Sequence, residues 1–305
     1  MRILLTGASS FTGFWFARLL ADAGHQVVAP LRGVRSDYAE APRAERVRRL
    51  GDCAEIVESC SFGGDRFLEL VRSQDIDLLC HHAAQVGDYK SPDFDVAGAL
   101  AANTHNLRRT LATGKIKGVL TTGSVSENDE GVGNEPLVAF SAYGLSKALT
   151  AKVIDFYCRE AGVLSGKFVV PNPFGPYEEP RFCAYLMRTW KAGNVAKVNT
   201  PAYIRDNIHV RLLAAAYVRY AEDLANGVAA PKLSPSGYVE TQGAFAERFA
   251  REIGSRLNLD CGLELADQTE FIEPVMRVNT EQAALYVLDW DETKAWDELA
   301  EYYSA

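Results

Sequence analysis

The strongest constraint on the fold is the alternation of apolar runs and helical patterns through residues 1–170 of the 305-residue chain. Helical patterns lie chiefly at 12–23, Asp65–Ser73, 97–113 and 141–161. Between them, short aliphatic runs predict strands at Arg2–Thr6, Gln26–Pro30, 55–58, 77–82, 118–123 and 166–171. Apolar strands separated by helices indicate a parallel sheet covered on both faces. We therefore predict an α/β fold with a doubly wound parallel sheet.

Residues at the ends of the helical patterns support these bounds. Ser141 is a suitable N-cap for 141–161, and Gly24, Gly114 and Gly162 follow helical patterns, where helices commonly end. After about residue 170 the alternation stops at a proline-rich stretch, and helices are predicted at 211–225 and Gln242–Leu257. We predict a dinucleotide-binding domain at 1–170 and a smaller mixed substrate lobe at 171–305, with an approximate boundary and interleaving of the two as an alternative.

Composition excludes several classes of protein. The formal net charge of −8 argues against a nucleic-acid binder, and no apolar run is long enough to span a bilayer. We see no signal-peptide pattern, no Cys-x-x-Cys among the 6 cysteines and no ligand spacing among the 5 histidines. We therefore expect reduced thiols, a cytoplasmic location, no metal and no membrane partner.

A glycine-containing segment, residues 6–13, joins the first predicted strand to the first predicted helix. Rossmann-type sheets bind dinucleotides at this position, because glycines let the backbone approach the pyrophosphate and the helix N-terminus favours its charge. A purely structural turn is the alternative, which the strand-turn-helix context disfavours. The expected cofactor contacts are Gly7, Ser9, Ser10, Phe11, Thr12 and Gly13.

The end of the second predicted strand indicates which dinucleotide is bound. An acidic residue there would bind the ribose 2′-hydroxyl of NAD, but residues 29–35 include no Asp or Glu. Arg32 and Arg35 are present instead, and guanidinium groups suit a 2′-phosphate. The pattern favours NADP over NAD, unless both arginines are simply solvated.

Tyr143 and Lys147 are four residues apart in a predicted helix, so they share one of its faces. A neighbouring cation favours the phenolate form of a tyrosine, which enables the phenol to exchange a proton with a carbinol oxygen. Thr122 and Ser124 end the preceding strand and offer hydroxyls to the same oxygen. Taken alone, the Tyr-Lys pair is equally compatible with a solvated helix face.

These features together resemble the extended short-chain dehydrogenase/reductase family, the NAD(P)-dependent sugar-nucleotide epimerases, dehydratases and reductases. The resemblance spans nearly the whole chain. Six motifs carry it in order: Thr6-Gly7…Gly13, His82-Ala83-Ala84, Thr121-Thr122, Ser141-Ala142-Tyr143-Gly144-Leu145-Ser146-Lys147, Pro171-Asn172-Pro173-Phe174-Gly175-Pro176 and Arg205-Asp206-Asn207-Ile208-His209-Val210.

The resemblance implies a role for each matching residue. Tyr143 would be the acid/base, and Lys147 would bind the nicotinamide ribose and lower the pKa of the tyrosine. Thr122 would bind the substrate oxygen, with Ser124 as the second choice. The other matching positions are Ala83 and Pro171 for the cofactor, and Asn172 and Arg205 for the nucleotide diphosphate of the substrate. Arg205 could instead form a plain ion pair, and His82 is expected to be a structural strand-end histidine.

The chain departs from the family pattern in three places. Ser10 replaces the middle glycine of the first motif, and Ser126 replaces the aromatic residue that usually follows Val125. Gly123 and Ser124 stand where the 4,6-dehydratases carry Asp-Glu. Dehydration needs an acid and a base, and neither replacement can supply one near neutral pH, so dehydration is disfavoured.

The remaining chemistry is reversible hydride transfer at a sugar carbon. NADP favours a 4-ketoreductase of a nucleotide-linked 4-keto-6-deoxyhexose over a 4-epimerase with tightly bound NAD. A non-catalytic NADP-binding regulator is a third interpretation, disfavoured because Tyr143 and Lys147 are both present. The family also implies a homodimer through a four-helix bundle of 97–113 and 141–161, with Ala99, Ala102 and Ala151 facing outward.

Overall fold

The computed structural model describes residues 1–305 except 88, 90, 114 and 305. A seven-stranded sheet forms its centre, in the order β11-β7-β5-β4-β1-β2-β3. The strands are β1 Arg2–Thr6, β2 Gln26–Pro30, β3 Glu55–Val57, β4 Leu78–His81, β5 Gly118–Ser124, β7 Leu164–Val170 and β11 Lys232–Leu233. Every pairing between neighbours in this sheet is parallel. The predicted doubly wound α/β fold is confirmed. The order in which successive strands are added to the sheet reverses between β1 and β4, since β2 and β3 lie on one side of β1 and the later strands lie on the other.

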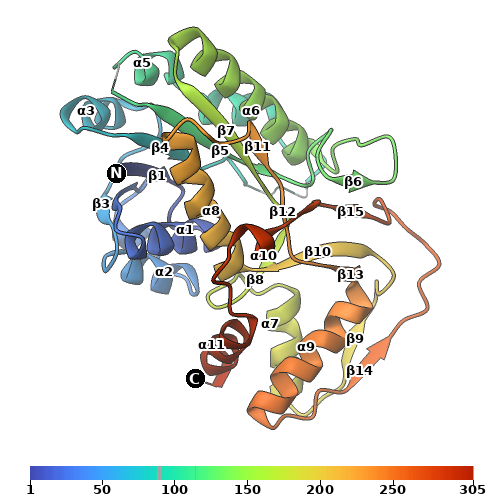
Figure 1. Ribbon diagram of the computed structural model, residues 1–305. Coiled ribbons are helices and arrows are strands. Elements are labelled where there is room, and N and C mark those ends of the chain that lie inside the picture. Colours follow the sequence, from blue (N-terminus) through green and yellow to red (C-terminus); the bar gives the residue numbers. More distant parts are fainter. Residues whose placement is uncertain (88, 90, 114, 305) are drawn as a thin grey trace.

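Helices cover both faces of the large sheet (Figure 1). One face carries α1 Phe11–Asp22, α2 Arg43–Leu50 and α8 Val210–Ala225, which enclose a core that includes Phe16, Phe168 and Tyr217. The other face carries α3 Asp65–Ser73, α4 Val96–Asn103, α5 Leu107–Leu111 and α6 Ala142–Ala161. A short 3-10 helix, η1 Arg35–Asp37, follows β2.

The second half of the chain contributes to both parts of the molecule. After β7 come β8 Asn172–Phe174, α7 Phe182–Lys191, β9 Ala196–Val198 and β10 Ile204–His209. The chain then returns to the large sheet through α8 and β11, where Lys232 pairs with Lys167 of β7. The two parts of the molecule are therefore interleaved in sequence.

The smaller lobe has its own core below the sheet in the view of Figure 1. Phe174, Trp190, Phe249 and Trp296 are all buried in it. Its other elements are β13 Tyr238–Thr241, α9 Gln242–Leu257, β14 Leu263–Leu265, β15 Arg277–Val278 and α11 Glu292–Ser304. The remaining elements, β12 Pro235–Ser236, β16 Glu281–Gln282 and α10 Ala283–Tyr286, lie next to the large sheet, and Ala283 is part of its core. β15 pairs with β6 Val132–Gly133, so the lobe also contacts the loop after β5.

The predicted helix at 97–113 is wrong as a single element. Residues 104–106 divide it into α4 and α5, because Asn106 has a left-handed backbone with φ 51°. Gly114, proposed as its end, lies outside the described residues. By contrast, Ser141 accepts a hydrogen bond from the Gly144 N–H and Gly162 ends α6 with φ 67°, so both predicted ends of that helix are confirmed.

Candidate active site

The loop between β1 and α1 has the close backbone packing that a dinucleotide site requires. Gly7 has a φ of +76°, and a Cβ there would lie 2.7 Å from the Ala83 nitrogen. A Cβ at Gly13 would lie 2.3 Å from the Gly7 carbonyl oxygen. Only glycine fits these positions, and the N-terminus of α1 points its free N–H groups at the same edge of the sheet.

Ser10 replaces the middle glycine of the motif without disturbing this turn. Its hydroxyl accepts from the Gly13 N–H at 3.1 Å and donates to the Gly7 carbonyl at 2.9 Å. His82 Nε2 lies 3.0 Å from the hydroxyls of both Ser10 and Thr12. Burial, with the charge of Lys147 adding to it, lowers the pKa of His82 to about 3. A neutral His82 therefore joins the end of β4 to the loop, which agrees with a structural role.

Two arginines that sequence reasoning missed also contact this loop. Arg43, the first residue of α2, donates to the Ser9 hydroxyl at 2.8 Å and stacks on the Tyr38 ring. Arg46 is 1% exposed and donates to the Ser9 carbonyl, to the Tyr177 carbonyl and to Glu179. Arg46 thus joins the loop to the segment after β8. No sequence signal marks either residue, because their hydrogen bonds to this loop and to the segment after β8 join residues 34 or more positions apart.

The two arginines predicted to bind a 2′-phosphate differ in their surroundings. Arg35 forms an ion pair with Glu58 at 2.9 Å. Arg32 is exposed at the end of β2, and no hydrogen bond or ion pair of its guanidinium group forms within the described part of the chain. A 2′-phosphate could therefore bind the Arg32 guanidinium without displacing a described protein partner, whereas the Arg35 guanidinium already forms an ion pair.

Tyr143 and Lys147 lie in the first two turns of α6, as predicted. Tyr143 is half-buried, and its ring makes edge contacts with Tyr89 at 5.8 Å and Phe94 at 5.9 Å. These rings come from the segment after β4, so they supply aromatic surroundings that position 126 lacks. Burial raises the pKa of Tyr143 to about 12, and Glu127 adds to this, while Arg181 opposes it. This direction is opposite to the lowering that the resemblance implies, because burial of the phenol is the largest influence on its pKa.

Lys147 is a buried cation on the same helix as Tyr143. It is 5% exposed, and its ammonium makes no hydrogen bond or ion pair to any residue that the structure describes. Burial lowers its pKa to about 8, with Glu127 opposing and Lys167 adding to the effect. Because an unpaired buried charge is costly, the position of Lys147 is suited to a ligand that supplies oxygen atoms. A nicotinamide ribose fits this requirement.

The two hydroxyls that end β5 have different environments. Thr122 is 3% exposed and its hydroxyl has no hydrogen-bond partner among the described residues. It faces Tyr217 of α8. Ser124 is half-buried, and its hydroxyl lies 2.8 Å from that of Ser126. Both residues lie at the carboxyl end of β5, where ligands bind in sheets of this kind.

The predicted substrate contacts lie beyond this edge. Asn172 is exposed at the start of β8, directly after the buried Pro171. Arg205 donates to the Pro274 and Val275 carbonyls and forms an ion pair with Glu273 at 3.0 Å. Its guanidinium is therefore already bound by protein groups. Arg181, at the start of α7, is exposed and its charge reaches Tyr143, which makes it a candidate that sequence reasoning missed.

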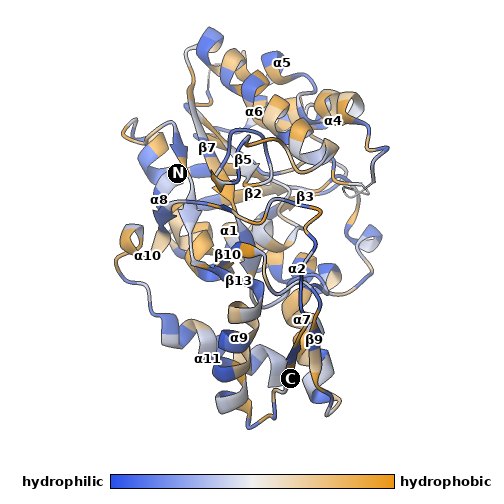
Figure 2. Cartoon of the chain, turned by 90° about the vertical axis from the view of Figure 1, so that its right-hand side faces the viewer, coloured by the Kyte–Doolittle hydropathy of each residue, from blue (hydrophilic) through white to orange (hydrophobic). Residues whose placement is uncertain are grey.

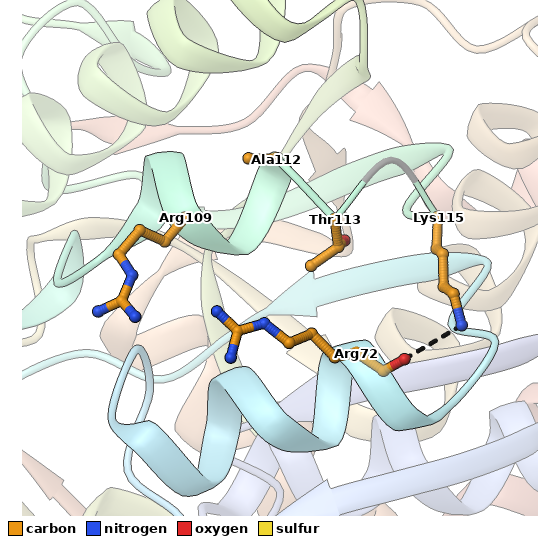
Figure 3. Close-up of a pocket in the computed structure, with 5 residues that line it drawn as sticks. All are labelled: Arg72, Arg109, Ala112, Thr113 and Lys115. Atoms are coloured by element: carbon orange, nitrogen blue, oxygen red, sulfur yellow. Dashed lines mark hydrogen bonds between the residues drawn. The ribbon is translucent and has the colours of Figure 1, made fainter.

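A separate cleft of about 270 Å³ lies between α3 and α5, lined by Arg72, Arg109, Ala112, Thr113 and Lys115 (Figure 3). Lys115 donates to the Arg72 carbonyl and pairs with Asp75. Arg72 and Arg109 lie in the last turns of their helices, where cations complement the helix dipole. The cleft is at the amino end of the parallel strands, away from Tyr143.

Among the described residues, no helix is long and apolar enough to cross a membrane, and no group of three or more His, Cys, Asp or Glu side chains is arranged to hold a metal ion. All six cysteines are free. Burial raises the pKa of the Cys53, Cys80 and Cys158 thiols, so these thiols are protonated near neutral pH.

Comparisons with known proteins place this geometry in a family. Residues 3–233 match the model of the NAD dependent epimerase/dehydratase family. The search of curated proteins returned no match. A UDP-glucose 4-epimerase from Thermotoga maritima, solved with UDP-glucose, has a TM-score of 0.74 and 17% identity, and the match covers 100% of this chain and 99% of that one.

Two further solved structures share the fold. A UDP-glucose 4-epimerase from Thermus thermophilus, in complex with NAD, has a TM-score of 0.71 and 15% identity, covering 100% of this chain and 99% of that one. A dTDP-glucose 4,6-dehydratase from Bacillus anthracis, in complex with NAD, has a TM-score of 0.74 and 15% identity, covering 100% and 96%. Because the family model matches well over half of the sequence, the chain belongs to the NAD dependent epimerase/dehydratase family of enzymes.

Proposed function

We propose that this protein is an NADPH-dependent 4-ketoreductase of a nucleotide-linked 4-keto-6-deoxyhexose. The observation that carries the proposal is a protonated phenol four residues before a buried ammonium on the same helix, where the ammonium has no hydrogen-bond or ion-pair partner among the described residues. Tyr143 has a pKa of about 12, so it is protonated near neutral pH and can donate a proton. Reduction of a ketone needs such a donor at the carbonyl oxygen.

Each residue of the site has one task in this proposal. Lys147 and the loop at residues 7–13 hold the dinucleotide, with Ala83 and Pro171 beside it, and Arg32 binds the 2′-phosphate. The bound cofactor supplies the hydride. Tyr143 gives its phenolic proton to the substrate oxygen, and a hydroxyl at the end of β5 orients that oxygen. Asn172 and Arg205 bind the nucleotide diphosphate, Arg205 exchanging Glu273 for phosphate oxygens.

NADPH oxidation with dTDP-4-keto-6-deoxyglucose tests the reaction. We expect turnover by the wild type and a loss of about 10²-fold to 10⁴-fold in Tyr143→Phe, with NADPH affinity unchanged, since only the proton donor is removed. Tyr157→Phe is the matched control on the same helix and should behave as wild type. Unchanged turnover in Tyr143→Phe would refute the mechanism.

The same assay assigns the substrate hydroxyl. Thr122→Val and Ser124→Ala each remove one hydroxyl and preserve shape. The variant with the larger fall in kcat identifies the group that binds the substrate oxygen. The resemblance favours Thr122, whereas exposure favours Ser124.

A 4-epimerase is the second candidate, because the similar solved structures include 4-epimerases, one in complex with NAD. Native mass spectrometry separates the two. NAD that copurifies and is released only by denaturation would support an epimerase. Empty protein that binds NADPH much more tightly than NADH supports the reductase. The wild type binding NADPH without any turnover across a panel of nucleotide sugars would favour a non-catalytic regulator.

We also propose a homodimer through α4 and α6. The expectation that Ala99 faces outward is wrong, because Ala99 is 1% exposed and packed within the subunit. The exposed apolar residues of α6 are Leu145 at 41% and Phe156 at 52%, and α4 is hydrophobic along most of its length (Figure 2). Light scattering should give twice 33.4 kDa for the wild type and less for Phe156→Asp.

A further inference from the structure

Four charged side chains form a connected cluster behind the end of β5. Lys167 of β7 pairs with Glu127 and with Glu130, each at 2.6 Å. Lys232 of β11 pairs with the second oxygen of Glu130 at 2.8 Å. Glu127 is 0% exposed and Glu130 is 6% exposed. Such buried pairs usually cost about as much as they contribute, so stability alone does not explain the cluster.

The cluster lies on the face of the sheet that α6 covers. Val119 of β5 packs in one core with Ile154 and Cys158 of α6. Because side chains alternate along a strand, Thr121 and Gly123 face the same helix. Lys167 is the register partner of Thr121 on β7. The Glu127 and Lys167 charges therefore lie on the same face of the sheet as Tyr143 and Lys147.

Gly123 leaves room for this pair. A Cβ at Gly123 would lie 2.5 Å from Lys167 Cε and 3.0 Å from Glu127 Oε1. The Lys167 side chain and the Glu127 carboxylate thus fill the space where a side chain at position 123 would begin. Because Glu127 is fully buried and paired with Lys167, it is not placed to exchange a proton with a sugar. Glu127 therefore contributes its negative charge and its hydrogen bonds to the site.

Glu127 also fixes the backbone that carries the site hydroxyls. Its carboxylate accepts the Ser124 N–H at 2.7 Å. The Ser126 carbonyl, two residues on, accepts from the Phe140 N–H and would lie 2.5 Å from a Cβ at Gly144 of α6. The end of β5 and the start of α6 are therefore in close contact through the turn that Glu127 holds.

We propose that Glu127 is a positioning residue of the Tyr143–Lys147 site, holding the end of β5 through the Ser124 N–H and maintaining a fixed negative charge next to α6. This inference rests on the proposed cofactor role of Lys147. It concerns no group that contacts substrate, and nothing in the motif pattern of the sequence marks Glu127.

The role of Glu127 can be measured through the pKa of Lys147. The charged or titratable groups that interact with this lysine are Glu127, Lys167 of β7, His81 at the end of β4 and His82 directly after it. Tyr143 lies four residues before it on α6. The pKa values of His81, about 4, and Tyr143, about 12, lie outside the range from pH 6 to 10. Lys147, with a pKa of about 8, titrates within it. Glu127 raises that pKa, so removing its charge must lower it.

The test is the affinity of the full-length protein for NADPH as a function of pH, measured by fluorescence, without any substrate. The wild type should bind NADPH less tightly as pH rises through about 8, as Lys147 loses its proton. In Glu127→Gln the midpoint should fall by roughly one pH unit. Glu130→Gln is the matched control. This change removes the other carboxylate that pairs with Lys167, yet Glu130 is not among the groups that shift the pKa of Lys147 or of Tyr143. The midpoint of this variant should therefore match wild type.

Each other outcome overturns a specific statement. No pH-dependent NADPH binding by the wild type would refute the proposed function and its use of Lys147. A wild-type midpoint in Glu127→Gln, or an equal shift in Glu130→Gln, would refute the role of Glu127 alone. If Glu127→Gln does not fold, Glu127→Gln with Lys167→Gln removes the buried pair as a whole. Because Glu127 influences Lys147 more than Lys167 does, the midpoint must still fall.

Discussion

Two buried cations in different regions of the molecule show how differently a positive charge can be accommodated. Arg277, in the smaller lobe, is 1% exposed and donates to the carbonyls of Glu127, Glu130 and Val138 at 2.7–3.0 Å. Lys147, beneath the cofactor edge, is buried to a similar degree and has no partner among the described residues. Removing a buried charge that has protein partners leaves those partners unsatisfied and destabilises the fold, whereas a buried charge without protein partners is suited to bind a ligand.

The largest expected effect on stability tests the first half of this comparison. Arg277→Met keeps most of the side-chain volume and leaves two buried carbonyls and one partly buried carbonyl without their donor. We expect the free energy of unfolding to fall by about 3 kcal/mol or more, measured by urea denaturation. The control is Arg159→Met, whose side chain is 72% exposed and paired only with Asp155, and which should change stability by less than about 0.5 kcal/mol. Equal effects in the two variants would contradict the structural role of Arg277.

Lys147→Met should act in the opposite direction. At pH 7 the folded state holds a charged lysine whose pKa is lowered from 10.5 to about 8, so burial of this group costs stability. Since the unfolded state binds the proton more tightly, that cost is greatest below pH 8 and disappears as pH rises towards 10.5. We expect the variant to be about 1–3 kcal/mol more stable than wild type at pH 7, with the difference shrinking at pH 10.

The loss of function is the other half of the same prediction. Lys147→Met should weaken NADPH binding by about 10²-fold, because an ammonium that binds ligand oxygens is replaced by an apolar group. Lys152→Met, on the same helix, is the control. A Lys147→Met protein that is less stable and still binds NADPH normally would show that Lys147 is a structural residue.

The third prediction compares two arginines at the end of β2. Arg32→Ala should reduce NADPH affinity by about 10-fold to 100-fold and leave NADH affinity unchanged, because only NADPH carries the 2′-phosphate. Arg35→Ala should have a smaller effect, since Arg35 is already paired with Glu58. Isothermal titration with both dinucleotides measures the two effects. A larger loss in Arg35→Ala, or an equal loss of NADH affinity, would rule out Arg32 as the phosphate ligand.

How much of this was predictable depends on the range of the contacts. The sheet strands, α6 with its caps, and the Tyr143–Lys147 pair follow local patterns, so the sequence shows them. The break between α4 and α5 depends on the left-handed conformation of one asparagine, which no periodicity reveals. Arg43 and Glu127 act through contacts to Ser9 and Lys167, 34 and 40 positions away, and only the folded chain brings these together. The raised pKa of Tyr143 follows from burial, which the sequence does not show.

The smallest expected effect tests whether a buried acid that forms no ion pair with a described residue also marks function in the smaller lobe. Glu178 is 7% exposed, has only the Tyr303 hydroxyl as a side-chain hydrogen-bond partner among the described residues, and burial raises its pKa to about 8. Because the folded state binds this proton more tightly, the stabilisation from the protonated acid is complete below pH 4.5 and is lost as pH rises through about 8. Glu178→Gln should therefore match wild type at pH 4.5 and be more stable by about 1 kcal/mol or more at pH 9, as measured by thermal unfolding.

If NADPH affinity and turnover are unchanged in the variant, a buried acid can be purely structural, and an unpaired buried charge, rather than burial alone, distinguishes Lys147. If turnover falls while stability rises, the comparison extends to the smaller lobe, and Glu178 joins the site.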